Sequence, residues 1–325
     1  MKRFSISVRS WDWNDRPVGS AGRGVGSLNG TLRKGWKRHR ISILFAAPFL
    51  LLFFVFTVMP VISAIFLSFT TYDILRPARF AGLRNYLMLF LKDGIFLIAA
   101  KNTLLFAFIL APMSLLASLF VAWMINEFTP KMRAFLTFVF YAPALSGAIN
   151  TIWMIIFNGD EYGTVNHYLL NLNLIREPIQ WLSNPRYAFF IVIVVTMWTS
   201  LGTGFLSLLA GFRGVDPSLY EAAAMDGIRN RIQELWYITL PVLKPQLMFA
   251  TLMSITSSFG IGEICNTLFG FPSPNYSAHT IVVHMMDFST NRFDLGMACA
   301  MAVTLFFLMV GSNKLANRFI SRVGK

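Results

Sequence analysis

Six long stretches of this chain contain no charged residue, and they restrict its possible folds more than any other feature. They cover residues 41–72, 102–126, 134–159, 187–212, 245–262 and 295–313. A helix rises about 1.5 Å per residue, so about 20 apolar residues cross the hydrocarbon core of a bilayer. In lipid, only helices and closed barrels satisfy the backbone, and these stretches lack the alternation of barrel strands. The pattern predicts an all-α polytopic membrane protein with six transmembrane helices.

The composition agrees with this fold class. Hydrophobic residues make up 55% of the chain and charged residues 13%, against about 45–50% and about 25% in an average soluble domain. Residues 86–100 are also apolar but carry Lys92 and Asp93 at their centre. A charge pair at the middle of a bilayer is costly. We therefore expect residues 86–100 to form an amphipathic helix on the membrane surface or against the bundle.

The distribution of Lys and Arg predicts the orientation. The N-terminal tail, the 127–133 turn, the 213–244 loop and the C-terminal tail together hold 20 basic residues, and the segments on the other side hold 8. Basic residues accumulate in cytoplasmic loops, so both termini are expected in the cytoplasm. Residues 1–40 are predicted to form a disordered basic tail and residues 317–325 a second tail. Because the positive charge is explained by topology, no nucleic-acid partner is expected.

The sequence offers little for catalysis. It contains no G-x-x-x-x-G-K-[ST] phosphate loop, so this chain is not expected to hydrolyse ATP by that device. His279 and His284 lie five residues apart, and neither they nor Cys265 and Cys299 form a metal-binding spacing. We expect no enzymatic activity, no metal and no cofactor in this chain.

The loop between the fourth and fifth spans, residues 212–245, has its own helix signals. Asp216 is a good N-cap, Pro217 suits the first helical position, and Gly227 suits the C′ position. These signals predict a helix over residues 218–226 and a second over residues 229–238. Pro241 disfavours helix at Leu240 and is expected to close the segment.

Residues of this loop resemble the cytoplasmic EAA loop of binding-protein-dependent ABC importer permeases. The matching residues are Glu221-Ala222-Ala223, Gly227, and Ile238-x-Leu240-Pro241. The resemblance implies a type I importer permease fold in which this loop is the coupling helix that docks on an ATPase. The residues it implies for coupling are Glu221, Ala222, Ala223, Asp226, Gly227, Leu240 and Pro241.

Further motifs are similar to those of the carbohydrate-uptake branch, the maltose-type and lipopolysaccharide-type inner-membrane permeases. These motifs are Phe80-x-Gly82-Leu83-x-Asn85-Tyr86, Asn102-Thr103, Pro143, Trp153 and Trp198. The resemblance covers residues 41–316. It departs at residues 268–272, where Leu-Phe-Gly-Phe-Pro stands in place of the branch's Thr-Gly-Gly-Gly-Pro element.

The resemblance implies a bacterial inner-membrane protein that works in a complex. Its implied partners are a second homologous permease, two cytoplasmic ATPase subunits, and an extracytoplasmic solute-binding protein that delivers a carbohydrate. An oligosaccharide is favoured as the solute.

Hydroxyl side chains in the fourth and fifth spans are the candidates for the solute pathway. Thr196, Thr199, Ser200 and Thr203 have the spacing of one helical face, and Trp198 lies among them. Ser254 and Ser258 share a face of the fifth span, and Glu263 is an acid near the end of that span. The alternative for each hydroxyl is ordinary packing between membrane helices, where Ser and Thr are common.

Two other functions remain open at the level of sequence. An ABC permease could carry a non-sugar solute, such as glycerol-phosphate, a polyamine or an anion. A secondary transporter driven by an ion gradient would need charged relay residues within its spans, and Glu263 is the candidate for that role. A membrane scaffold would not need the spacing of the EAA loop.

Overall fold

The computed structural model describes residues 44–147 and 149–321, and the chain divides after Pro60 into two units. Residues 44–60 of the first unit are helical. They belong to a continuous helix, Leu44–Leu67, which contains the π-helical turn η2 (Phe54–Val58) and ends as α2 (Met59–Leu67). The predictions for the basic tail of residues 1–40 lie outside the described residues.

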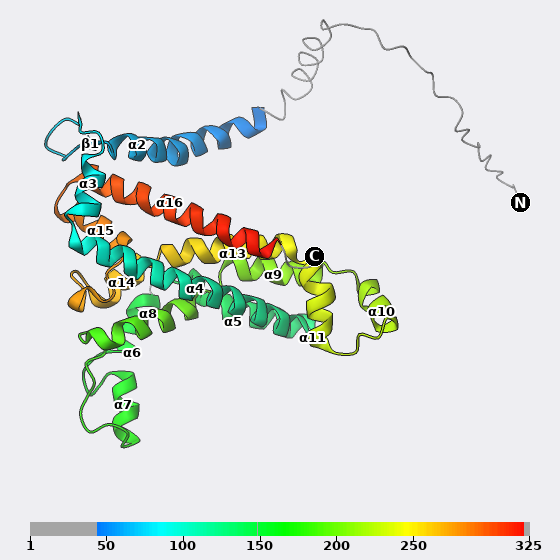
Figure 1. Ribbon diagram of the computed structural model, residues 1–325. Coiled ribbons are helices and arrows are strands. Elements are labelled where there is room, and N and C mark those ends of the chain that lie inside the picture. The colour runs from blue at the N-terminus through cyan, green and yellow to red at the C-terminus, as the bar shows by residue number, and fades with distance from the viewer. Residues whose placement is uncertain (1–43, 148, 322–325) are drawn as a thin grey trace, which may run out of the picture. The chain divides into compact units, whose positions relative to one another are not determined.

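The second unit is mostly helical (Figure 1). Its elements, in chain order, are β1 (Thr70–Thr71), β2 (Arg79–Phe80), α3 (Arg84–Leu91), α4 (Gly94–Asn126), α5 (Pro130–Leu145), α6 (Ile149–Ile156), α7 (Thr164–Asn171), α8 (Pro185–Thr199), α9 (Thr203–Arg213), α10 (Pro217–Met225), α11 (Arg231–Glu234), the π-helical turn η3 (Leu235–Thr239), α12 (Leu240–Val242), α13 (Lys244–Phe259), α14 (Gly262–Phe269), the short turn η4 (Pro274–Tyr276), α15 (Ile281–Met286), the π-helical turn η5 (Asp287–Asn291) and α16 (Leu295–Ile320). The last helix continues four residues into the predicted C-terminal tail, residues 317–325.

The predicted spans are present as helices, but two of them are broken. Within the described residues, four helical segments are long and apolar enough to cross a membrane: Leu44–Leu67, α4, Lys244–Phe269 and α16. Two more spans result if α5 with α6 and α8 with α9 each count as one, although these pairs are bent by 86° and 44°. The fold is thus a helical membrane architecture with four to six candidate spans.

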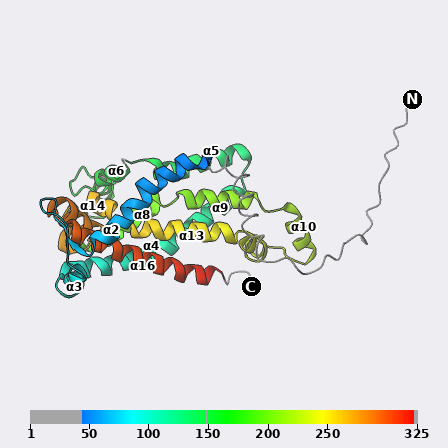
Figure 2. The ribbon, with the colours of Figure 1, turned by 90° about the horizontal axis from the view of Figure 1, so that it is seen from above.

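The centre of the second unit is a bundle of α4, α9, α13 and α16, which run side by side in both ribbon views (Figure 1, Figure 2). Aliphatic and aromatic side chains fill the space between α4, α9 and α13, with Ile125, Phe205, Leu208 and Leu247 all buried. Tight packing of this kind holds membrane helices together, because the surrounding lipid is as apolar as the side chains.

The prediction of one helix over residues 86–100 is wrong. The chain forms α3, breaks at Lys92 and Asp93, and restarts as α4. The Asp93 side chain accepts a hydrogen bond from the Phe96 backbone N–H at 3.0 Å, so Asp93 is the N-cap of α4. A carboxylate at an N-cap satisfies an otherwise unpaired N–H, and this local contact divides the apolar stretch into two helices.

A small two-stranded sheet joins α3 to the start of α16. Thr70 in β1 pairs with Phe80 in β2, and the Asn85 side chain donates to the carbonyl oxygens of Ser68 and Thr70 at 2.9 and 2.8 Å. A Cβ on Gly296 would lie 2.3 Å from the Thr70 carbonyl oxygen, so only glycine allows this close approach. Asn85 therefore has a structural role in anchoring the sheet.

Candidate functional site

The break between α8 and α9 shapes the candidate pathway. α8 ends at Thr199, where the Ser200 hydroxyl donates to the Met197 carbonyl at 2.7 Å. α9 starts again at Thr203, with Gly202 at its N-cap. The predicted single face of Thr196, Thr199, Ser200 and Thr203 is therefore wrong, because helical periodicity does not continue across a 44° bend.

The break nevertheless gathers hydroxyl groups around one pocket. An open pocket of about 370 Å³ lies where the break meets α5 and α13. Its lining residues are all uncharged: Ser118, Tyr141, Ala144, Thr199, Ser200, Gly202, Thr203, Gly204, Met253, Ser254, Thr256 and Ser257. Discontinuous membrane helices commonly bind solutes at such breaks, because the interrupted backbone is exposed to a cavity there.

A close helix contact holds the pocket's shape. A Cβ on Gly204 would lie 3.2 Å from the Ala250 Cα, so the first turn of α9 approaches the α13 backbone more closely than is usual beside a Cβ. Small residues at such crossings let membrane helices pack backbone to backbone. The position of Thr203 relative to Ser254 depends on this contact.

The pocket hydroxyls are suited to accept hydrogen bonds. Thr199 Oγ1 lies 3.1 Å from the Thr196 carbonyl, and Ser200 donates to Met197 as described above. Because these hydroxyl hydrogens are used within α8, the oxygen lone pairs remain for a donor in the pocket. A solute with many O–H groups supplies such donors.

The structure does not bring four of the predicted pathway residues into the pocket lining. Thr196 is buried, and its Oγ1 has no hydrogen-bond partner among the described residues. Ser258 is buried and donates to the Ser254 carbonyl at 2.7 Å. Glu263 is exposed in the first turn of α14. Trp198 is 55% exposed and packs edge to face on Trp153, with ring centroids 6.1 Å apart.

The loop helix α10 has the local structure that its sequence predicts, shifted by one residue. The Asp216 carboxylate caps it by accepting the Ser218 N–H at 3.0 Å, which lowers the pKa of Asp216 below its usual value. At the other end, Gly227 has a φ of +91°. The Ile228 N–H reaches the Ala223 carbonyl at 3.0 Å, which is a Schellman ending.

The second half of the loop differs from the prediction. The expected helix over residues 229–238 begins at Arg231, after Asn230 caps it, and becomes the π-helical turn η3. Leu240 is helical and Pro241 does not close the segment, contrary to expectation. In η3 the Leu240 N–H bonds to the Leu235 carbonyl five residues earlier. This wider turn lets the helix continue to Pro241, which has no backbone N–H that would need a hydrogen-bond acceptor.

The residues implied for coupling fall into two groups. Glu221, Ala222, Asp226 and Gly227 are exposed on α10 or its end, and α10 protrudes from the bundle (Figure 1). Ala223 is only 8% exposed and Leu240 is in the bundle core, with Pro241 beside it. The exposed group is available to another protein, and the buried group lies on the inner side of α10 or in the bundle.

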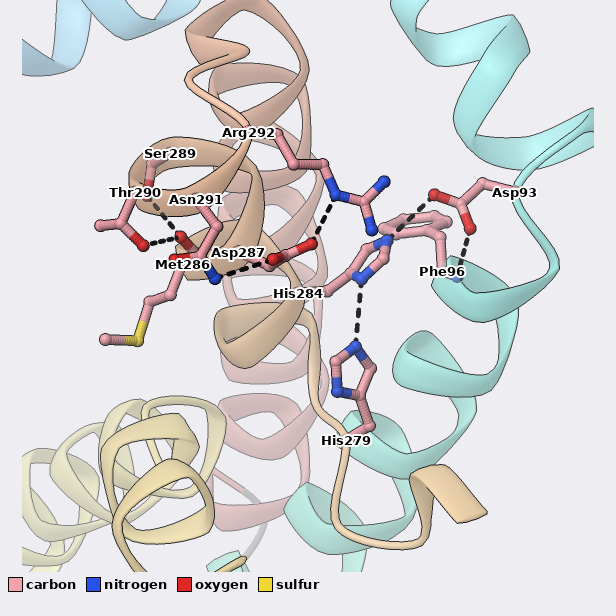
Figure 3. Close-up of polar contacts among 10 residues, drawn as sticks. All are labelled: Asp93, Phe96, His279, His284, Met286, Asp287, Ser289, Thr290, Asn291 and Arg292. Atoms are coloured by element: carbon pink, nitrogen blue, oxygen red, sulfur yellow. Dashed lines mark hydrogen bonds and ion pairs between the residues drawn. The ribbon is translucent and has the colours of Figure 1, made fainter. Parts of the chain in front are cut away.

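Sequence reasoning missed a buried polar cluster at the start of α4 (Figure 3). His284 Nε2 lies 2.9 Å from Asp93 Oδ2, and its Nδ1 lies 3.0 Å from His279 Nε2. Nearby, Arg292 Nε pairs with Asp287 Oδ2 at 2.6 Å. The spacing of the two histidines was visible, but Asp93 is 191 residues from His284. Among the described residues, no group of three His, Cys, Asp or Glu side chains could hold a metal ion.

A second missed cluster lies before α8. Asn166 is fully buried, and its amide nitrogen donates to the carbonyl oxygens of Asn158, Asp160 and Ile179. Its amide oxygen accepts from the Ile179 N–H and from Trp181 Nε1. The sequence carried no signal for this cluster, because it does not show that Asn166 is buried.

Several known proteins with sequences similar to this chain are transporter permeases. No model of a known protein family matches it. The probable ABC transporter permease protein YesP of Bacillus subtilis (strain 168) is 31% identical over 84% of this chain and 88% of its own length. AraP, the arabinooligosaccharides permease of the same organism, is 30% identical over 86% and 89%. The lactose transport system permease protein LacF of Rhizobium radiobacter is 30% identical over 82% of this chain and 89% of its own length.

Solved structures share the fold. A chain of a bacterial ABC transporter involved in the import of the acidic polysaccharide alginate matches with a TM-score of 0.72 at 24% identity, over 91% of this chain and 100% of that chain. A structure of the alginate transporter in complex with a periplasmic protein that binds an alginate pentasaccharide matches with a TM-score of 0.72 at 23% identity, over 90% and 98%.

Proposed function

This chain belongs to the carbohydrate-uptake branch of the ABC transporter permeases, and from that premise we propose that it moves a carbohydrate, with an oligosaccharide favoured, across the bacterial cell membrane. The observation that carries the proposal is the uncharged, hydroxyl-lined pocket at the α8–α9 break. The chain is a transport subunit rather than an enzyme, and separate ATPase subunits supply the energy for transport.

The chemistry of the pocket matches a sugar. Sugar hydroxyls both donate and accept hydrogen bonds, and the pocket offers the oxygens of Thr199, Ser200, Thr203 and Ser254 within about 370 Å³. Solute sites of this size are usually apolar with a few polar groups that fix orientation. The pocket is partly open, and we propose that the second permease subunit closes it to form the pathway.

The proposed topology has six spans with both termini in the cytoplasm. It takes α5 with α6 and α8 with α9 as two broken spans. The excess of Lys and Arg in the tails and in the 127–133 and 213–244 segments supports the orientation. In this arrangement α10 lies on the cytoplasmic side, and the α6–α8 connection and the 270–294 segment lie outside.

The proposed partners follow from membership of this family. A second homologous permease and two ATPase subunits complete the membrane complex, and an extracytoplasmic binding protein delivers the solute. The exposed side of α10, with Glu221, Ala222 and Asp226, is the proposed contact with an ATPase. Such a contact transmits work only if it differs between two states of the bundle.

Substitutions in the pocket test the proposed pathway. Replacing both Thr199 and Ser200 with Leu should abolish uptake of the solute by the reconstituted complex, because the two side chains fill the pocket and remove its acceptors. Complex assembly, measured by co-purification of the ATPase subunits, should remain intact.

A matched control separates the pocket from general effects of losing a hydroxyl. Thr304 on α16 also donates to a carbonyl of its own helix, that of Ala300 at 2.8 Å, and lies outside the pocket lining. Thr304→Val should keep normal uptake. Normal uptake by the Thr199→Leu/Ser200→Leu variant would return these hydroxyls to a packing role. Uptake of a non-sugar solute alone by the native complex would replace the carbohydrate by one of the open alternatives.

A further inference from the structure

The coupling helix α10 has an outward and an inward face. Glu221, Ala222 and Met225 are exposed, Met225 at 89%. Ala223 is buried, with an exposed fraction of 8%, and Tyr220, one turn before it, is half-buried. Tyr220 and Ala223 are three residues apart, so they share the face that points back to the rest of the chain.

A partly buried hydrogen bond joins this inward face to the membrane bundle. Tyr220 Oη lies 2.9 Å from Thr239 Oγ1, and 19 residues separate the two in the chain. Thr239 is only 3% exposed. Its hydroxyl donates to the Glu234 carbonyl at 3.2 Å. Since that hydrogen is used, the Tyr220 hydroxyl donates to Thr239 Oγ1, and the contact has a defined direction.

The π-helical turn η3 positions Thr239 for this contact. The turn places one extra residue between Leu235 and Leu240, whose backbones are hydrogen-bonded across it. An extra residue in a helical turn changes the direction of the side chains on either side of it. Here Thr239 faces α10, while the next residue, Leu240, is buried in the bundle core.

From η3 the connection runs directly into the bundle. Leu240 and Leu243 are 7% and 1% exposed, and both belong to the apolar cluster that includes Ile125 of α4 and Phe205 of α9. α13, whose Ser254 lines the pocket, begins at Lys244. A displacement of η3 therefore acts on the helix that carries one wall of the pocket.

An ion pair that also links this loop to the bundle is weaker. Arg231 pairs with Glu127 in the α4–α5 turn at 3.5 Å, but the two side chains are 67% and 49% exposed. Ion pairs exposed to water contribute little, because water screens them and the long side chains lose freedom. The Tyr220–Thr239 bond, whose Thr239 end is buried, is the more rigid connection.

We propose that Tyr220 and Thr239 are positioning residues that make α10 and η3 move as one body, so that a force on α10 reaches α13 instead of bending the loop. This inference rests on the proposed coupling role of α10. It assigns the transmission of motion to two residues behind the docking surface, where neither one touches the ATPase or the solute.

The test compares ATP use with transport. The full complex is reconstituted in lipid vesicles with loaded binding protein, and the number of ATP molecules hydrolysed per solute transported is measured. Tyr220→Phe removes only the donor hydroxyl, and Thr239→Val removes the acceptor at nearly constant size. Each should raise this ratio at least about fivefold, the lower end of typical coupling between sites.

Matched variants exclude a merely structural effect. Thr239→Ser keeps the hydroxyl and should keep the native ratio. Tyr237→Phe removes a hydroxyl from the same turn, but Tyr237 is 67% exposed, so its ratio should not change. The double variant Tyr220→Phe/Thr239→Val should be no worse than either single variant, because all three lack the same bond.

Three outcomes decide the inference. A native ratio in both Tyr220→Phe and Thr239→Val overturns it, provided that Glu221→Lys still uncouples hydrolysis from transport. If Glu221→Lys also has no effect, the coupling role of α10 fails and this inference fails with it. A rise in the ratio for Tyr237→Phe equal to that for Tyr220→Phe would show a general effect of the turn and would also overturn it.

Discussion

His279 Nε2 lies 3.0 Å from His284 Nδ1, so one of these two nitrogens carries a hydrogen and the other accepts it. The Asp93 carboxylate can only accept, so His284 Nε2 carries the hydrogen directed at Asp93 Oδ2. His279 Nδ1 is buried and has no hydrogen-bond partner among the described residues. A second proton on His279 would therefore find no acceptor.

Acid should destabilise the chain through His279. Burial and the neighbouring His284 lower the pKa of His279 to about 4, whereas the pKa of an unfolded histidine is about 6.5. Between these values unfolding takes up a proton, so the free energy of unfolding falls as the pH falls from 6.5 towards 4, by up to about 3 kcal/mol. Thermal unfolding of the purified protein over this range measures it.

A pair of substitutions isolates that contribution. His279→Gln keeps an N–H that can reach His284 but does not titrate, so the loss of stability between pH 6.5 and 4 should become smaller. His167 is exposed on α7, and His167→Gln should leave the pH dependence unchanged. An unchanged slope in His279→Gln would mean that another group controls the acid sensitivity.

The connection between α6 and α8 should depend on Asn166. Asn166→Leu fills a similar volume but leaves the Ile179 N–H, Trp181 Nε1 and three carbonyl groups without their partner. Unpaired buried polar groups cost about 1–3 kcal/mol each. Amide hydrogen exchange of residues 158–184 should accelerate strongly. Asn171→Leu, which removes an exposed amide bonded to His167, should have little effect.

The close contact between α9 and α13 should disfavour a branched side chain. Gly204→Val forces α9 away from Ala250, whose Cα would lie 3.2 Å from the new Cβ. Overpacking of this kind costs about 1–3 kcal/mol, so thermal stability in detergent and uptake should both decrease. Gly311 on α16 has open space at its Cβ position. Gly311→Ala should be neutral or stabilising by up to about 1 kcal/mol. Equal stability of the two variants would refute the contact.

The end of α10 should require glycine. Gly227 has a φ of +91°, which proline cannot adopt and a Cβ disfavours by about 1–2 kcal/mol. Gly227→Pro should cut transport severely while the membrane spans still insert. Gly214 lies in the same loop without positive φ, and a Cβ there meets its nearest atom at 3.4 Å. Gly214→Ala should transport normally. Full transport by Gly227→Pro would contradict the coupling role.

Reporter fusions should test the orientation. Fusions after Lys131 and after Arg229 should report a cytoplasmic location, and a fusion after Asn171 should report an external one, because basic residues concentrate in the 127–133 and 213–244 segments. A cytoplasmic signal at Asn171 would refute the proposed topology.

Sequence patterns were most reliable where the deciding interaction is local. Charge-free stretches indicated the membrane helices, because a charged side chain at the bilayer centre is costly. Asp216 and Gly227 marked the ends of α10, because both act on backbone groups within a few residues. The same reasoning overlooked Asp93, which has the same capping role within an apolar stretch.

Distant contacts account for what the sequence did not reveal. The bend at Ser200–Gly202 brings Thr203 into a pocket with Ser254, and helical spacing alone placed Thr203 with Thr196 instead. Tyr220 meets Thr239 because of a π-helical turn that has no clear residue signature.

The sequence by itself thus determined that the chain forms apolar helices, where its loop helix begins and ends, and which family it resembles. Only the tertiary structure decided which hydroxyls share a pocket, which face of α10 is free, and that Asp93, His284 and His279 form one chain of hydrogen bonds. The reason is physical: helix formation and capping depend on neighbours in the sequence, whereas burial and side-chain pairing depend on groups that meet only after the helices have packed.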